Sequence, residues 1–128
     1  MKVFIYKNLT RNCWSIRCQE GRMRGRVIHH ALSWTLYNVV FKVSQSGRAR
    51  VLHEKRKNVH AGITGYLDSW VGLDGHTGSL VTNPIDTRGN AVSYNPYRGD
   101  HFYRVTDGTA IATASMVQAD ANNVYAYD

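Results

Sequence analysis

The chain has 128 residues, of which 43% are hydrophobic, and its formal net charge is +7 at pH 7. This length suits a single domain, residues 1–128, with one hydrophobic core. The sequence has no apolar run of about 18 residues, which excludes a membrane-spanning helix, and the segment after Met1 lacks the apolar stretch of a signal peptide. We therefore expect a soluble, cytoplasmic protein.

Positive charge is concentrated in the first half of the chain. Residues 1–65 contain 13 Lys and Arg against two Glu, a net charge of +11, whereas residues 66–128 contain three Arg against seven Asp, a net charge of −4. Such Lys and Arg enrichment favours a polyanionic partner, and we expect nucleic acid or a nucleotide rather than a membrane. The alternative is a solubilising surface whose two halves attract each other in the folded protein.

Short segments rich in Val, Ile, Tyr, Phe, Trp and Thr alternate with Gly, Asn and Asp, which is typical of β-strands. The strands are predicted at 3–7, 14–18, 26–30, 35–43, 59–67, 92–94, 101–105, 111–117 and 124–127. In the fourth of these, strict alternation places Tyr37, Val39, Phe41 and Val43 on one core-facing side. The predicted fold class is mainly β, with α+β as the alternative: a compact antiparallel sheet, barrel or sandwich with at most one or two short helices.

Cys13 and Cys18 are the two cysteines of the chain. In an extended strand this spacing directs them to opposite faces and separates them by more than about 15 Å, which is beyond the reach of a disulfide. We therefore expect both thiols to be reduced. No Cys/His pair with zinc-finger spacing completes a metal site around them.

The densest cluster of cationic and titratable side chains lies between Gly47 and Gly65. Arg and Lys bind phosphate, His transfers protons near neutral pH, and Glu can act as a base. The segment is therefore predicted to bind an anion. Its candidate phosphate ligands are Arg48, Arg50, Lys55, Arg56 and Lys57, and its candidate catalytic residues are His60, His53 and Glu54.

Two local conformations fit this cluster. With Ser46 as N-cap, residues 47–57 form a short helix that stops at Asn58; alternatively, they form one arm of a hairpin. After Asn58 the alternation of apolar residues predicts the strand 59–67, in which His60 points away from the core. Such an orientation suits a surface site.

A second candidate binding segment reads YNPYRGDHFY. It places Tyr94 and Tyr97 around a tight turn beside Arg98, and aromatic rings near Arg can stack on bases while the cation holds phosphate. We assign Tyr94 and Tyr97 to stacking and Arg98 to phosphate binding. The alternative is that these tyrosines pack the turn onto the sheet.

Residues 68–90 are rich in Gly, Thr, Ser and Asp and are expected to form a long loop or insertion. Within it, Asp74 and His76 could join Asp68 or Asp86 around a metal ion. Their spacing matches no standard metal loop, and Gly-rich loops commonly use Asp in turns. We therefore predict neither a metal nor a cofactor.

Three segments, KNLTRNCWSI, GRARVLHEKRKNVHAGITG and SYNPYR, together resemble small proteins encoded by phages and other mobile elements. The resemblance spans roughly residues 7–104, interrupted by the 68–90 loop. It implies a small accessory protein that acts in the host cytoplasm. It carries over no catalytic residue, because the resemblance comes without an assigned activity.

Three functions from different classes remain. The first is a binding module that holds nucleic acid or a nucleotide phosphate on a basic surface, in nucleic-acid metabolism or against host defence. The second is a small metal-independent endoribonuclease or phosphodiesterase that uses His, Glu, Lys and Arg. The third is a structural or protein-inhibitor module, such as a component of the phage particle or an inhibitor whose partner is an acidic host protein. The second function, catalysis, requires six dispersed titratable or cationic residues to converge on one concave surface. We call them the wider catalytic set: His30, Arg50, Glu54, Lys57, His60 and His101.

Overall fold

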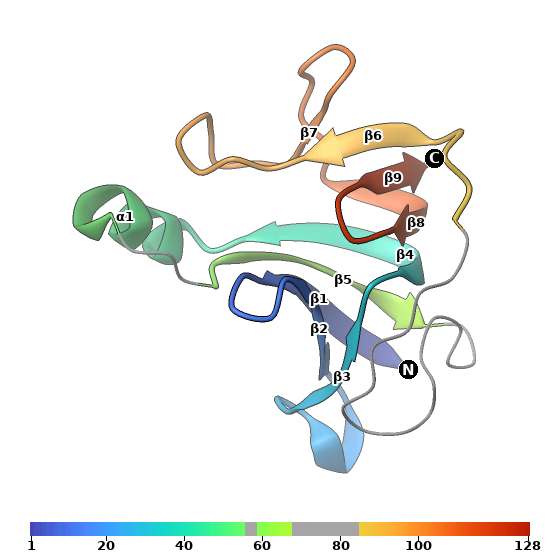
Figure 1. Cartoon of the computed structure of the whole chain (residues 1–128). Helices are drawn as coiled ribbons and strands as arrows, with labels where there is room; N and C mark the ends of the chain where they lie inside the picture. The colour runs from blue at the N-terminus through green and yellow to red at the C-terminus, as the bar shows by residue number, and fades with distance from the viewer. Residues whose placement is uncertain (56–58, 68–84) are drawn as a thin grey trace.

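The computed structural model describes residues 1–55, 59–67 and 85–128. These residues form one antiparallel sheet of nine strands and one α-helix (Figure 1). The predicted mainly β class, with an antiparallel sheet and few helices, is therefore confirmed. None of the described helices is long and apolar enough to cross a membrane.

The strands follow the expected segments with shifted ends. The elements in chain order are β1 Lys2–Asn8, β2 Cys13–Cys18, the 3-10 turn Gly21–Met23, β3 Val27–Ala31, β4 Trp34–Val43, α1 Gln45–Glu54, β5 Ala61–Leu67, β6 Asn90–Ser93, β7 Tyr103–Arg104, β8 Thr113–Ala119 and β9 Val124–Tyr127. Their order across the sheet is β3-β2-β1-β5-β4-β8-β9-β6-β7. The expected strand at 101–105 is thus a two-residue strand, and Val59 and His60 precede β5 rather than belonging to it.

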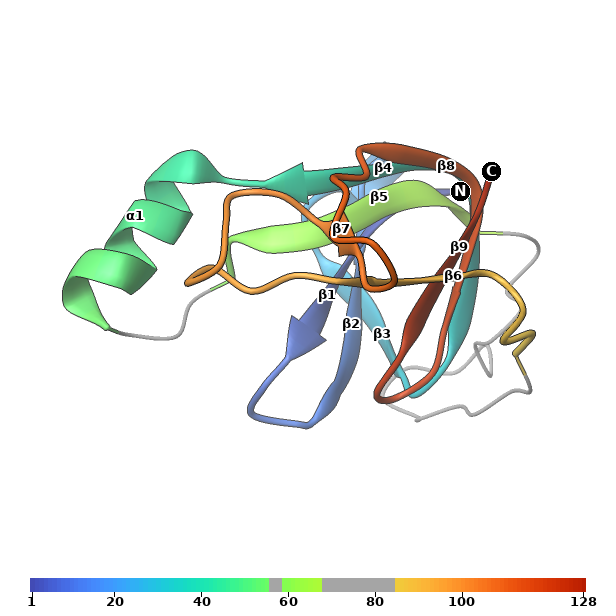
Figure 2. The ribbon, with the colours of Figure 1, turned by 90° about the horizontal axis from the view of Figure 1, so that it is seen from above.

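The sheet is bent, so that β1 and β2 run at an angle to β8 and β9 (Figure 2). Two hydrogen bonds connect β1 and β2 to the turn between β8 and β9. Trp14 Nε1 on β2 donates to the carbonyl oxygen of Asp120 at 2.8 Å, and Lys7 Nζ on β1 donates to that of Ala121. Both acceptors lie in the turn between β8 and β9. The bend therefore encloses the face of the sheet that holds the core.

Apolar side chains from alternate strand positions fill this concave face. They include Val3, Ile5, Ile16, Trp34, Leu36, Ile63 and Val117, all of which are almost completely buried. Trp14 packs edge-to-face on Trp34, with ring centroids 5.4 Å apart, and Phe41 packs on Phe102 at 5.0 Å. These aromatic contacts connect β4 with β2 on one side and with the segment before β7 on the other.

The expected strict alternation in β4 is wrong at Tyr37. The pairing register with β5 shifts between Tyr37 and Val40, and Asn38 has a positive φ of 51°. This bulge changes which parity faces the core, because an extra residue reverses the alternation. Val39 and Phe41 are buried as expected, whereas Tyr37 is 38% exposed.

The helical conformation of the cationic segment is the observed one, and it begins two residues earlier than expected. Ser44, rather than Ser46, is the N-cap, and its hydroxyl accepts a hydrogen bond from the Gly47 amide at 3.2 Å. The helix ends where Lys55 adopts the left-handed conformation. Of the helical residues only Val51 is buried. Asn58, the expected stop, lies outside the described residues.

The expectations for the two cysteines and for the 68–90 loop can also be compared with the structure. Cys13 and Cys18 are free and buried, as expected for reduced thiols. Most of the expected 68–90 loop, including Asp74 and His76, lies outside the described residues. Its last part is held to the sheet, because Gln118 Oε1 accepts a hydrogen bond from the Asp86 amide at 3.0 Å.

Gly62 in β5 is expected to tolerate no side chain. A Cβ atom there would lie 2.3 Å from Cζ of Phe4 and 2.7 Å from the carbonyl oxygen of Ile5. Gly62→Ala should therefore lower the free energy of unfolding in urea by about 1–3 kcal/mol through overpacking. Gly99→Ala is the matched control, since its nearest contact would be 3.4 Å. Equal stability of the two variants would contradict the close packing at Gly62.

Asp86 should titrate far below an ordinary carboxyl. The Arg88 side chain donates hydrogen bonds to both of its carboxylate oxygens and lowers the pKa of Asp86 to about 2. Because the unfolded pKa is about 3.9, the stabilisation is present above about pH 4 and is lost as the pH falls through about 2. NMR titration of the carboxyl carbon should show this midpoint, and Arg88→Gln should raise it. A wild-type midpoint near 4 would exclude the interaction.

Candidate nucleic-acid interface

Helix α1 extends beyond the end of β4, and the turn that follows β6 lies against it (Figure 2). Arg48 makes this contact: its Nε donates to the carbonyl oxygens of Pro96 at 3.0 Å and Gly99 at 2.9 Å. The Ser44 amide also donates to the carbonyl oxygen of His60 at 2.6 Å. Three chain segments far apart in sequence are thereby held together, and Arg48 positions the turn.

A groove of about 480 Å³ lies between these segments. We call it the α1 groove; its lining residues are Lys7, Leu9, Val51, Lys55, Val59, His60, Ala61, Tyr94, Asn95, Pro96 and Tyr97. Among these described lining residues there is no Asp or Glu. Two lysines, a histidine and two tyrosines therefore share a groove with several apolar side chains.

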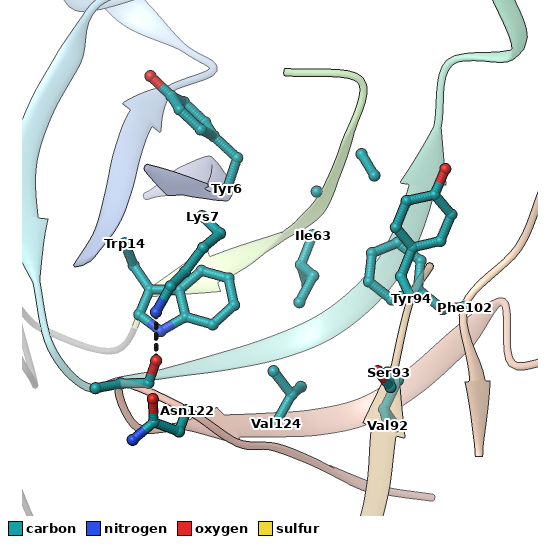
Figure 3. A pocket seen from close by; sticks show the side chains of 13 residues that line it. Tyr6, Lys7, Trp14, Ile63, Val92, Ser93, Tyr94, Phe102, Asn122 and Val124 are labelled. Atoms are coloured by element: carbon teal, nitrogen blue, oxygen red, sulfur yellow. Dashed lines mark hydrogen bonds between the residues drawn. The ribbon is translucent and has the colours of Figure 1, made fainter. Parts of the chain in front are cut away.

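A second pocket of about 300 Å³ adjoins the α1 groove on the concave face of the sheet (Figure 3). The two share Lys7, Ala61 and Tyr94 as lining residues. Lys7 points toward the β8–β9 turn and lies above Trp14, with its Nζ 5.1 Å from the ring centroid. The cation is thus fixed where the two pockets meet.

His60 and Tyr94 form the best-defined polar contact in the groove. His60 Nε2 lies 2.7 Å from the Tyr94 hydroxyl, and their rings meet edge-to-face at 5.4 Å. Tyr94 also stacks on Phe102 at 5.1 Å. Burial raises the pKa of Tyr94, and the nearby Arg48 cation opposes this effect in part. The phenol is therefore neutral at physiological pH and can donate a hydrogen bond or accept one.

Tyr97 stands at the rim of the groove with 66% of its surface exposed. The Asn95 side chain accepts a hydrogen bond from the Tyr97 amide at 2.9 Å, which fixes the tight turn of the NPYR sequence. The next residue, Arg98, places its guanidinium 4.2 Å from the ring centroid of Tyr103. The exposed ring and the neighbouring cation are therefore presented by one ordered turn.

The other expected site residues are distributed more widely. Lys55 is exposed and lines the groove. Arg50, His53 and Glu54 are exposed on α1 and do not line it. Arg56 and Lys57 lie outside the described residues. The structure thus brings His60, Tyr94, Tyr97 and Lys55 together, and it leaves His53 and Glu54 on the exposed last turn of the helix.

The wider catalytic set does not converge on this groove in the described part of the chain. His30 Nδ1 lies 3.1 Å from the Ser15 hydroxyl on the neighbouring strand β2, and His101 pairs with Asp100. Sequence reasoning missed Lys7 as a lining residue. In the sequence, Lys7 can be recognised only as a cation at the end of a mostly apolar predicted strand. Which residues lie opposite Lys7 depends on the order of the strands in the sheet.

Comparison with known proteins places the chain in a phage protein family. A family model described as the Mycobacterium phage L5 gene 82 protein matches residues 1–127. The chain is also 33% identical over 132 residues to the gene 82 protein of Mycobacterium phage L5, covering 98% of this chain and 95% of that protein. No solved structure matches the chain. The expected kinship with phage-encoded proteins is confirmed, and the chain belongs to the family of the Mycobacterium phage L5 gene 82 protein.

Proposed function

We propose that the protein binds nucleic acid or nucleotide phosphate groups through the α1 groove. The observation that carries this proposal is the composition of the groove. Lys7, Lys55 and the exposed ring of Tyr97 line it together, and no acidic residue is present among its described lining residues. A cationic groove with an exposed aromatic ring provides both contacts that nucleotides require, namely phosphate attraction and base stacking.

The two tyrosines have different roles in this proposal. Tyr94 already contacts His60 and Phe102, so its ring is part of the groove wall. Tyr97 is the stacking residue because its ring is exposed at the rim. Lys55 and Arg98, which are both exposed, supply positive charge for phosphates. Arg48 contributes indirectly, since its Nε holds the turn that carries Tyr97.

Replacing the rim residues should weaken binding in two distinguishable ways. Tyr97→Ala should reduce affinity for a fluorescein-labelled RNA by about 5-fold to 150-fold, because a stacked base contributes about 1–3 kcal/mol. Lys55→Gln should lower the slope of log affinity against log salt by about 0.7–0.9. Fluorescence anisotropy at several salt concentrations measures both effects.

Arg88→Gln is the matched control, since it removes one exposed positive charge that does not line the groove. It should leave binding nearly unchanged. Wild-type protein that binds neither RNA, DNA nor nucleotides at low salt would contradict the proposal. A stable, nuclease-resistant complex with a protein would then favour the structural or inhibitor function.

A second candidate function is metal-independent cleavage of a phosphodiester. The 2.7 Å contact between His60 and Tyr94 favours it, because an imidazole held by a phenol can transfer protons beside a bound phosphate. Lys7 and Lys55 would supply positive charge for the transition state. His53 and Glu54 are the less suited candidates, since they lie outside the groove lining.

Cleavage makes a separate prediction. Wild-type protein should cleave single-stranded RNA in the presence of a chelator, and His60→Ala should abolish cleavage while the folded protein still binds RNA. Tyr94→Phe, which keeps the stacked ring but loses the hydroxyl, should reduce the rate and leave binding intact. Gel analysis of labelled RNA measures the rate. Cleavage that His60→Ala leaves unchanged would exclude this assignment.

A further inference from the structure

The face of the sheet opposite the core carries an ordered set of aromatic and cationic side chains. We call it the outer face; it comprises Lys2, Phe4, Tyr6, Arg17, Tyr37, Lys42 and Tyr66. Lys2, Phe4 and Tyr6 share one side of β1 by alternation, opposite the buried Val3 and Ile5.

Strand pairing extends this side of β1 across four neighbouring strands, β2-β1-β5-β4 (Figure 1). Directly opposed residues of an antiparallel pair project from the same face. Phe4 opposes Arg17 on β2, and Lys2 opposes Tyr66 on β5. Tyr66 in turn opposes Tyr37 on β4, so the row runs across three strands.

Lys42 belongs to the same face. Lys42 opposes Gly62 on β5. The Phe4 ring lies directly over Gly62, since a Cβ atom added to Gly62 would be 2.3 Å from Cζ of Phe4. Lys2 and Lys42 are exposed, and Tyr37 and Tyr66 are 38% and 43% exposed. The bulge at Asn38 is what turns Tyr37 outward. Two rings on adjacent strands are therefore accessible, with Lys2 opposite Tyr66 and Lys42 further along β4.

The cations of the outer face have no acidic neighbours on these strands. Strands β2, β1, β5 and β4 contain no Asp or Glu. Arg17 is held by aromatic rings, with its guanidinium 5.7 Å from the centroid of Phe4 and 5.3 Å from that of Tyr6. Among the described residues its buried Nε has no hydrogen-bond partner. Glu20, just after β2, accepts a hydrogen bond from the Lys2 amide at 3.1 Å, so one carboxylate lies at the edge of this face, whereas the four strands themselves contribute only cations.

We infer that the outer face binds single-stranded nucleic acid, with Tyr37 and Tyr66 stacking on bases and Lys2, Lys42 and Arg17 attracting the phosphates. Charge complementarity selects a polyanion, and exposed rings select one whose bases are unpaired, since bases in a duplex already stack on each other. This inference rests on the proposed nucleic-acid function and assigns to it a second surface and a strand type.

The test uses fluorescein-labelled oligothymidylate of about 12 nucleotides and a duplex of equal length. The double variant Tyr37→Ala/Tyr66→Ala should bind the single strand at least about fivefold more weakly than the wild type, because each stacked base contributes about 1–3 kcal/mol. Tyr37→Phe/Tyr66→Phe is the matched control: it keeps both rings and should bind like the wild type. Circular dichroism and thermal unfolding verify that all variants are folded.

The charges make an independent contribution to this test. Lys2→Gln/Lys42→Gln should lower the slope of log affinity against log salt by about 1.4 for the single strand. Equal affinity of the wild type and the double Ala variant would overturn the inference, as would tighter binding of the duplex than of the single strand. A protein ligand whose binding requires Tyr37 and Tyr66, without oligonucleotide binding, would overturn it too.

Variants of the α1 groove separate this inference from the proposed function. If Tyr97→Ala weakens binding and Tyr37→Ala/Tyr66→Ala does not, the groove is retained and the outer face is excluded. If only the outer-face variant weakens binding, the outer face is retained and the groove is excluded. Loss of affinity in both variants supports two surfaces.

Discussion

The bend of the sheet is the constraint on which the rest of the described structure depends. A single sheet buries an apolar face only if something covers that face, and here the two halves of the sheet cover each other. The hydrogen bond from Trp14 to Asp120 and the contact of Lys7 with Ala121 join the halves. Trp14 also packs on Trp34, so the same residue closes the sheet and fills its core.

The bend also creates the candidate binding surfaces. On the concave side it leaves a pocket beside Lys7 that continues into the α1 groove. On the other side it leaves the outer face, whose strands carry cations but no carboxylates. The excess positive charge of the first half of the chain is thus presented on two surfaces, because β1, β2, β4 and α1, which carry much of it, all come from that half.

Local sequence patterns determine how much of the fold and of the candidate site could be predicted. Alternation located most strands, since burial on one side of a strand leaves a period of two in the sequence. It failed at Tyr37, because a bulge is set by the backbone of Asn38 and its pairing, which no periodicity reveals. The candidate groups His60, Tyr94 and Tyr97 were found from residue type alone. Their proximity was not predictable, since 34 positions separate His60 from Tyr94.

The sequence by itself determined the mainly β class, the reduced cysteines, the basic first half and the residue types capable of binding phosphate and bases. These properties depend on composition and on neighbours along the chain. Only the tertiary structure decided that Arg48 holds a turn, that Lys7 lines the groove and that Tyr66 and Tyr37 lie side by side. Strand order and register bring distant residues together, and these are fixed by burial of the whole sheet rather than by any one segment.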